Sequence, residues 1–289
     1  MIKPDFIIKN ANYEGCTADF SEADLVLIGA GYDGTSSYRP GSRFAPIALR
    51  GETILAQEEY SPYFKKDIRD LPIHDLGDVD IPFGNKVEAL SRIEAASRYI
   101  VENGKRPVFI GGEHLISLPA FKPVFEKHPD IRVIHLDAHL DLIDELFGER
   151  ESHGTVMRRI SELMGKPGRI LQLGIRSGSR EDYEYAAANT RLIEFTLKGA
   201  EKYLEEFSQY PLYLSIDLDV FDPALLPGTG TPEAGGIFFN EFVDFLKQIQ
   251  SLNIVAADVV ELAPHIDPTG NSTVIASKIL RETLMALSG

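Results

Sequence analysis

The sequence predicts an α/β fold in which a mostly parallel sheet of about eight strands carries helices on both faces. Short apolar segments rich in β-branched residues alternate with longer segments that suit helices along the chain. The apolar segments are almost continuously hydrophobic, as expected of parallel strands that helices bury on both faces. The 289 residues contain no linker, repeat or low-complexity stretch, so we expect a single domain over residues 1–289.

The predicted elements follow an irregular segment at residues 1–22. Strands are expected in the apolar runs at residues 23–29, 71–78, 106–112, 131–141, 168–176, 192–196, 211–219 and 254–262. Helices are expected between them, at residues 46–57 and 85–103, up to residue 125, and at residues 155–164, 179–188, 198–208, 240–251 and 272–287. Local signals mark some boundaries, since Pro46 suits a first helical turn and Gly104 ends the second helix.

The first strand leads into residues 31–41, a segment too rich in glycine and serine for regular structure. It contains neither the Gly-Lys-Ser/Thr nor the Gly-x-Gly-x-x-Gly pattern of phosphate-binding loops. We therefore expect this loop to lie beside a substrate or at an interface.

Composition excludes several classes of protein. The formal net charge of −15 argues against a nucleic-acid partner, which requires a basic surface. No apolar run approaches the roughly 20 residues that span a bilayer, so no membrane partner is expected. The first residues lack the apolar core of a signal peptide. Cys16 is the single cysteine, which rules out an internal disulfide and suits a reducing, cytoplasmic location.

Two predicted strands end in acids and an imidazole. Asp137, His139 and Asp141 follow one apolar run, and Asp217 and Asp219 follow another. Alternate side chains of an extended chain point the same way, so each group converges if the pleat persists to its end. One such strand end could be a solvated turn. Two of them, at the edge where α/β sheets form their sites, argue for a shared polynuclear metal site.

His114 follows a third strand and brings a second imidazole to the same edge. Six ligands are too many for one small cation and suit two, with Asp137 and Asp217 as bridges. Two cations about 3.5–4 Å apart can activate a shared water as a nucleophile at neutral pH. Carboxylate-rich ligation with two imidazoles favours manganese over zinc. The expected cofactor is therefore two Mn²⁺ ions per chain.

Several motifs that occur in order resemble the ureohydrolases, the arginase and agmatinase family. They are Gly-Gly-Glu-His at 111–114, Asp-Ala-His-Leu-Asp at 137–141, Ser-His-Gly at 152–154, Ser-Ile-Asp-Leu-Asp-Val-Phe-Asp-Pro at 215–223, and Glu261. The resemblance runs from about residue 24 to the end. It implies a three-layer α/β/α sandwich, a binuclear manganese centre that hydrolyses a guanidinium group to urea, and a homo-oligomer, either a trimer or a hexamer.

The resemblance also implies roles for individual residues. His153 matches the histidine proposed to move protons, and a histidine near its neutral pKa suits protonation of a leaving amine. Glu261 matches the carboxylate that receives the guanidinium, which pairs bidentately with carboxylates. The alternative carboxylate, Asp258, lies in mid-strand, where a structural hydrogen bond is the better interpretation. Asp141 joins His153 and Glu261 as catalytic. One ion would be held by His114, Asp137, Asp141 and Asp217, and the other by Asp137, His139, Asp217 and Asp219.

The chain departs from the family pattern at two positions. Glu113 stands where the family usually has aspartate, and Leu140 stands where it usually has threonine. Neither is an expected ligand, so we expect altered hydrogen bonding around the metals rather than loss of metal.

Substrate-binding positions point away from arginine. Arginases carry asparagines where this chain has Ile143 and Glu151, so the α-substituents of arginine would lack partners. Either Glu151 or Asp144, expected near the mouth of the site, would tolerate the distal ammonium of agmatine. The leading hypothesis is hydrolysis of the guanidino substrate agmatine to urea and putrescine, a step of polyamine biosynthesis.

Other functions stay open at this point. A related ureohydrolase could use guanidinobutyrate, arginine or a formimino amino acid, with Arg39, Arg43 or Arg176 binding a carboxylate, although surface ion pairing is the simpler role for each. More distant alternatives are a single-zinc deacetylase and a non-catalytic metal-binding protein. Nothing around Cys16 suggests the activated thiol of a deiminase.

Overall fold

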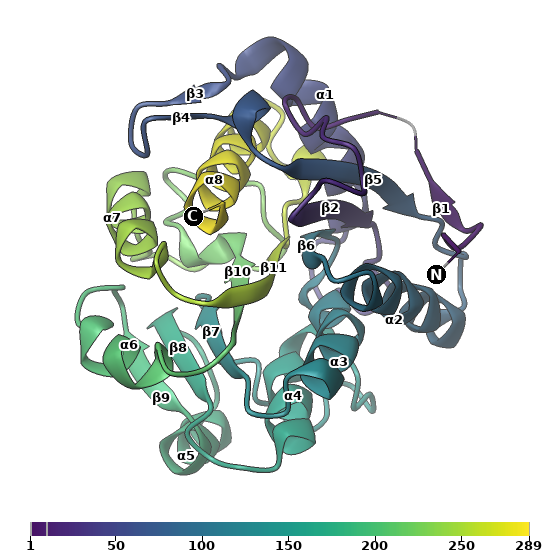
Figure 1. The fold of residues 1–289 in the computed structure, drawn as a ribbon. Helices are drawn as coiled ribbons and strands as arrows, with labels where there is room; N and C mark the ends of the chain where they lie inside the picture. Colours follow the sequence, from purple (N-terminus) through teal and green to yellow (C-terminus); the bar gives the residue numbers. More distant parts are fainter. Residues whose placement is uncertain (1, 10, 289) are drawn as a thin grey trace.

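The computed structural model describes residues 2–9 and 11–288, and its strands and helices alternate along the chain as predicted (Figure 1). A nine-stranded sheet has the order β1-β5-β2-β6-β11-β10-β7-β8-β9. Its strands are β1 (Ile7–Ile8), β2 (Leu25–Ala30), β5 (Ile73–Val79), β6 (Arg106–Gly111), β7 (Arg132–Leu136), β8 (Ile170–Ile175), β9 (Arg191–Glu194), β10 (Leu212–Asp217) and β11 (Ile254–Val260).

The eight longer strands of this sheet are the eight predicted ones, and they pair in parallel. β1 pairs with β5 in the antiparallel sense at the edge. It lies in the segment predicted to be irregular, so that prediction is wrong at these two residues. The hairpin of β3 (Tyr60–Ser61) and β4 (Lys66–Asp67) was not predicted either. Strands of two residues are too short to show any periodicity.

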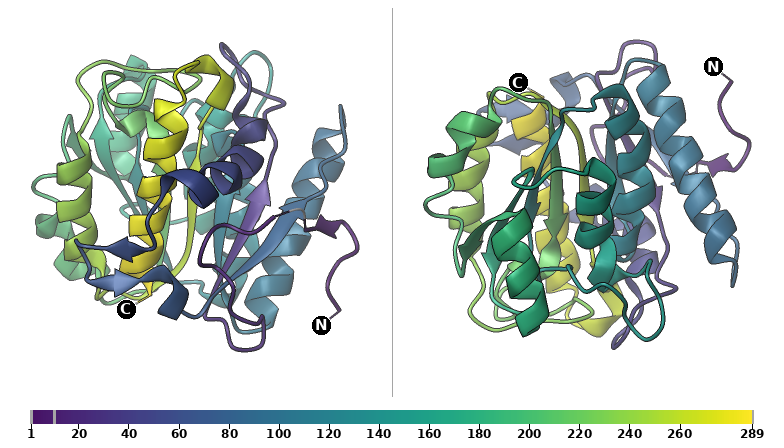
Figure 2. Two further views of the ribbon diagram at one scale, coloured as in Figure 1. Left: turned by 90° about the horizontal axis from the view of Figure 1, so that it is seen from above. Right: turned by 90° about the horizontal axis from the view of Figure 1, so that it is seen from below.

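Helices cover both faces of the sheet (Figure 2), which confirms the three-layer α/β/α sandwich. One core packs beneath α1 (Ala45–Ala56), α6 (Glu201–Phe207), α7 (Phe239–Ile249) and α8 (Asn271–Leu287). The other packs beneath α2 (Lys86–Glu102), α3 (Ser117–Lys127), α4 (Val156–Met164) and α5 (Arg180–Asn189). In the part of the chain that the structure describes, no helix is long and apolar enough to cross a membrane.

The central strands are buried on both faces because their side chains alternate between the two cores. In β10, Leu214 and Ile216 enter one core, whereas Tyr213 enters the other. The order β6-β11-β10-β7 at the centre brings together four strands that are distant in sequence. Since all four are parallel, their carboxyl ends meet at one edge of the sheet.

Candidate active site

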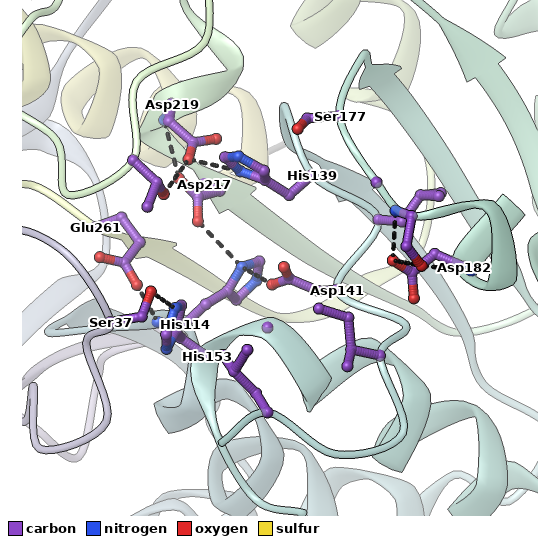
Figure 3. A pocket seen from close by; sticks show the side chains of 17 residues that line it. Ser37, His114, His139, Asp141, His153, Ser177, Asp182, Asp217, Asp219 and Glu261 are labelled. Atoms are coloured by element: carbon purple, nitrogen blue, oxygen red, sulfur yellow. Dashed lines mark hydrogen bonds and ion pairs between the residues drawn. The ribbon is translucent and has the colours of Figure 1, made fainter. Parts of the chain in front are cut away.

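The segments that follow the four central strands bring the predicted site residues to this edge, and all of them except Asp137 line a cavity of about 320 Å³ (Figure 3). His153 comes from farther along the chain, in the 3₁₀ turn His153–Thr155. The pleat does not persist as far as the sequence suggested: β7 ends at Leu136, and Asp141 lies in the following loop with φ 53°. β10 likewise ends at Asp217. The loops, rather than strand pleating alone, therefore complete the convergence.

His114 lies among three carboxylates. Its Nδ1 is 3.2 Å from Asp137 Oδ2 and 3.1 Å from both Asp141 Oδ2 and Asp217 Oδ2. None of these contacts has hydrogen-bond geometry, so this buried nitrogen has no hydrogen-bond partner. Three carboxylate oxygens directed at one such nitrogen are arranged as ligands around a cation would be.

The tautomer of His114 follows from the residues behind it. Ser215 Oγ donates to Asp258 Oδ1 at 2.7 Å, so it can only accept from His114 Nε2, which is 2.9 Å away. Nδ1 is then unprotonated in the neutral ring, and its lone pair faces the acids. Tyr213 also donates to Asp258, at 2.6 Å. Asp258 therefore has the structural role expected of a mid-strand carboxylate, and it leaves His114 Nδ1 in the form that a metal ligand would require.

A second group forms around His139. Its Nδ1 lies 3.0 Å from Asp219 Oδ2 and 3.5 Å from Asp137 Oδ1. Asp137 thus touches both groups through different oxygens, the arrangement that a bridging ligand requires. Asp217 Oδ1 accepts the backbone N–H of Asp219 at 2.9 Å, which ties the two acids of the β10 edge together.

His135 is a member of the site that the sequence reasoning missed. It belongs to a group of closely spaced potential ligands with His114, Asp137 and Asp141. Both of its ring nitrogens are already engaged, however. Gln172 Nε2 donates to His135 Nδ1 at 3.1 Å, which leaves Nε2 to donate to Asp137 Oδ2 at 2.8 Å. His135 therefore orients Asp137 instead of binding metal, and its position two residues earlier on the same strand face was the available signal.

The pKa values of buried groups at the site are strongly shifted. Burial raises the pKa of Asp217 well above its usual value, and the neighbouring charges of Asp219 and Asp137 raise it further. Burial lowers the pKa of His114, but the surrounding carboxylates outweigh burial and bring the pKa well above its usual value. The negative charge of the neighbouring buried carboxylates contributes to both shifts, and a bound cation would offset it.

Glu261 follows β11 and lies in the left-handed region with φ 68°. A non-glycine residue holds that conformation only where its surroundings enforce it, and such strain is common at functional sites. Glu261 Oε1 accepts the backbone N–H of His114 at 2.7 Å. Burial raises its pKa well above its usual value, and the charge of Glu113 adds to the effect.

His153 lies at the cavity beside the loop of residues 31–41 (Figure 3). Its Nε2 is 3.1 Å from Ser37 Oγ, and its Nδ1 is 3.4 Å from Thr35 Oγ1. Burial lowers the pKa of His153. Ser37 also lines the cavity, so this loop, predicted to lie beside a substrate or at an interface, contributes to the candidate site.

The carboxylates expected at the mouth are placed differently. Asp144 is exposed and pairs with Arg150 at 3.2 Å and Arg159 at 2.5 Å, and neither it nor Glu151 lines the cavity. Asp182, the third residue of α5, lines it instead. Its carboxylate is buried, and Oδ2 accepts the backbone N–H of Ser179 in a capping box at 2.8 Å.

None of the three candidate arginines lines this cavity, although Arg39 lines a small adjoining pocket together with His153 and Glu261. Arg43, which is exposed at one side, pairs with the buried carboxylate of Asp33 at 2.9 Å, so the ion pair expected for it lies only partly at the surface. Arg39 and Arg176 instead donate to backbone carbonyl oxygens, for example those of Thr229 and Asp219. Their guanidinium groups therefore hold loops around the site.

Comparison with known proteins identifies the relatives of this chain. The model of the arginase family matches residues 23–286. An agmatinase of Bacillus subtilis is 43% identical over 271 residues, which cover 92% of this chain and 93% of the relative. A guanidinobutyrase of Pseudomonas aeruginosa is 32% identical and covers 94% of this chain and 89% of its own length.

Two solved structures resemble this chain in both fold and sequence. The agmatine ureohydrolase of Thermoplasma volcanium has a TM-score of 0.85 at 31% identity, covering 97% of this chain and 95% of that one. The proclavaminate amidino hydrolase from Streptomyces clavuligerus has a TM-score of 0.85 at 31% identity and covers 99% of both chains.

Proposed function

Because the chain belongs to the arginase family and is a ureohydrolase, we propose that it hydrolyses agmatine to urea and putrescine with two Mn²⁺ ions. The observation that carries the proposal is the cavity itself. It combines the carboxylate-rich ligand set with Glu261 on one side and the buried acid Asp182 on the other (Figure 3). Agmatine has a cation at each end, so each end would meet a carboxylate.

The donor set fits two divalent cations. His114, Asp137, Asp141 and Asp217 would hold one ion, and Asp137, His139, Asp217 and Asp219 the other. The unpartnered Nδ1 of His114 among three carboxylate oxygens supports this assignment, and oxygen-rich ligands with imidazole suit Mn²⁺. When bound, the pair of ions supplies an acidified water as nucleophile at neutral pH.

The protein side chains would hold the substrate for this attack. Glu261 pairs with the planar guanidinium and orients its carbon. The aliphatic side chains of Leu140, Ile143 and Leu146 line the cavity and suit the methylene chain. Asp182 would receive the distal ammonium, in place of the Asp144 or Glu151 expected from the sequence.

His153 would move the protons. The lowered pKa of its imidazole keeps the ring neutral at neutral pH, so it can accept a proton from the attacking water. It then returns the proton to the departing amine as the tetrahedral intermediate collapses.

Substrates with a carboxylate fit less well. Among the described residues that line the cavity, none is lysine or arginine. The carboxylate of guanidinobutyrate or arginine would therefore approach buried acids without a cationic partner. Guanidinobutyrate is nevertheless the main rival, because one relative is a guanidinobutyrase.

The test compares agmatine, guanidinobutyrate, arginine and a formimino amino acid with Mn²⁺-loaded protein, and quantifies urea together with the amine product. We expect urea and putrescine in equal amounts from agmatine, with a metal content near two Mn²⁺ per chain. Urea from arginine but not from agmatine would refute the proposal. A single bound zinc would instead favour a deacetylase, and a loaded protein inert toward every guanidine would favour a non-catalytic metal-binding protein.

The remaining parts of the proposal concern the cell. A cytoplasmic location suits the single buried cysteine, Cys16. Assembly into a homo-oligomer, a trimer or hexamer, follows from the family resemblance and is tested by light scattering of the purified protein.

A further inference from the structure

Glu113 is a buried carboxylate next to the expected ligand His114, and it faces the loop of residues 31–41. Its Oε2 accepts the backbone N–H of Thr35 at 2.8 Å and the hydroxyl of Ser36 at 3.2 Å. Its Oε1 accepts the hydroxyl of Thr35 at 2.5 Å. An ionised carboxylate only accepts hydrogen bonds, so all three hydrogens come from the loop.

This arrangement decides what Thr35 can do for His153. The hydroxyl hydrogen of Thr35 is committed to Glu113, so its oxygen is left as an acceptor. That oxygen accepts the backbone N–H of His153 at 3.1 Å and lies 3.4 Å from His153 Nδ1. A proton on Nδ1 satisfies the second contact, whereas an unprotonated Nδ1 would place two lone pairs against each other.

Ser37 completes the arrangement at the other ring nitrogen. Its Oγ is 3.1 Å from His153 Nε2 and is free to donate there. One short loop segment, Thr35–Ser37, therefore contacts both ring nitrogens of His153. Glu113 holds this segment through hydrogen bonds to Thr35 and Ser36. Since Ser37 is exposed and lines the cavity, Nε2 is the nitrogen directed to the substrate side.

We propose that Glu113 is a positioning residue for His153. Acting through Thr35, it selects the tautomer with hydrogen on Nδ1 and leaves Nε2 as the atom that exchanges protons in the cavity. Metal-bound and catalytic histidines commonly have their tautomer fixed in this way, by a hydrogen bond to the ring nitrogen that does not react. The kinetic consequence rests on the proposed function, whereas the tautomer does not.

The direct test is the tautomer of His153. Two-bond ¹⁵N–¹H NMR spectra of histidine rings in Mg²⁺-loaded protein report it, and His153→Asn identifies the signals. The spectra are recorded at pH 8.5, well above the ordinary pKa of a glutamate side chain. We expect the Nδ1–H tautomer in the parent protein and loss of that preference in Glu113→Ala and Thr35→Val. An Nε2–H parent, or an unchanged tautomer in both variants, overturns the proposal.

Kinetics provide the second test. Glu113→Ala and Thr35→Val are expected to lower kcat about 10- to 100-fold with little change in KM or metal content, whereas Thr35→Ser retains activity. In a His153→Ala background the same two substitutions should lower kcat no further, because they act through His153. Equal losses in both backgrounds, or loss of metal, would mean that Glu113 acts on the metal centre instead.

A matched control is Thr53→Val. Thr53 is a buried threonine on α1, away from the cavity, whose hydroxyl donates to the carbonyl of Arg50 at 2.9 Å. It should lose stability as Thr35→Val does but keep kcat. A parent protein that hydrolyses no guanidine would refute the proposed function alone, since the NMR test would still decide the role of Glu113.

Discussion

Ser215 gives its hydroxyl hydrogen to Asp258 across a distance of 2.7 Å. This bond lies behind the proposed metal ligands, yet it determines which nitrogen of His114 carries the ring hydrogen. Because Ser215 can then only accept, His114 must donate from Nε2, and Nδ1 is left free to bind a cation.

Asp258→Asn is the test of that relationship. The amide of asparagine can donate to Ser215, whose hydroxyl would then donate to His114 Nε2 and place the ring hydrogen on Nδ1, against the acids. We expect the affinity for Mn²⁺ to fall about 10- to 100-fold, measured by calorimetric titration. Asp244→Asn, an exposed acid on α7, should leave the affinity unchanged; equal affinities in the two variants would contradict this account.

Asp217→Asn should separate repulsion from ligation. Without metal, asparagine avoids the burial of a charge at this position and its repulsion by Asp219 and Asp137, which together raise the pKa of Asp217, so the melting temperature should rise. With Mn²⁺ at about 100 times Kd, the free energy of unfolding of the parent protein should rise by about 2.7 kcal/mol. Most of this increase should be absent from the variant. Thermal melts with and without metal measure both effects. A variant that gains as much from Mn²⁺ as the parent would remove Asp217 from the ligand set.

His135→Ala distinguishes an orienting residue from a ligand. The side chain donates to Asp137 at 2.8 Å and accepts from Gln172, so its loss should weaken Mn²⁺ binding about 10- to 100-fold. The stoichiometry at saturating metal should stay at two ions per chain, as determined by elemental analysis. A fall to one ion would show that His135 is a ligand after all.

Asp182→Ala addresses substrate choice. Loss of a charged partner for the distal ammonium should lower kcat/KM for agmatine about 10- to 100-fold, through a higher KM, as expected for a hydrogen bond to a charged group. Activity on guanidinobutyrate should fall less, or rise, because a buried negative charge has been removed. The controls are Asp144→Asn and Glu151→Gln, which lie outside the cavity lining. Larger losses in either control than in Asp182→Ala would restore the interpretation made from the sequence.

Local sequence patterns were sufficient to predict much of the fold and much of the candidate site. The alternation of apolar runs with helical segments predicted the eight parallel strands, because burial on both faces makes such strands continuously apolar. It also predicted which acids and imidazoles meet, since parallel strands bring their carboxyl ends to one edge. The roles proposed for His153 and Glu261 came from family resemblance, because neither lies in a local pattern that marks it.

Tertiary structure alone decided the rest. Three features join segments that are far apart in the chain: the order of the strands, the approach of Asp182 to the cavity, and the contact between Glu113 and Thr35. A fourth, the left-handed conformation of Asp141, depends on the loop in which it lies. The hydrophobic period of a sequence indicates on which face of its own strand or helix a residue lies. It does not report which distant backbone that face will meet, and the proposed histidine tautomers and substrate preference rest on those distant contacts.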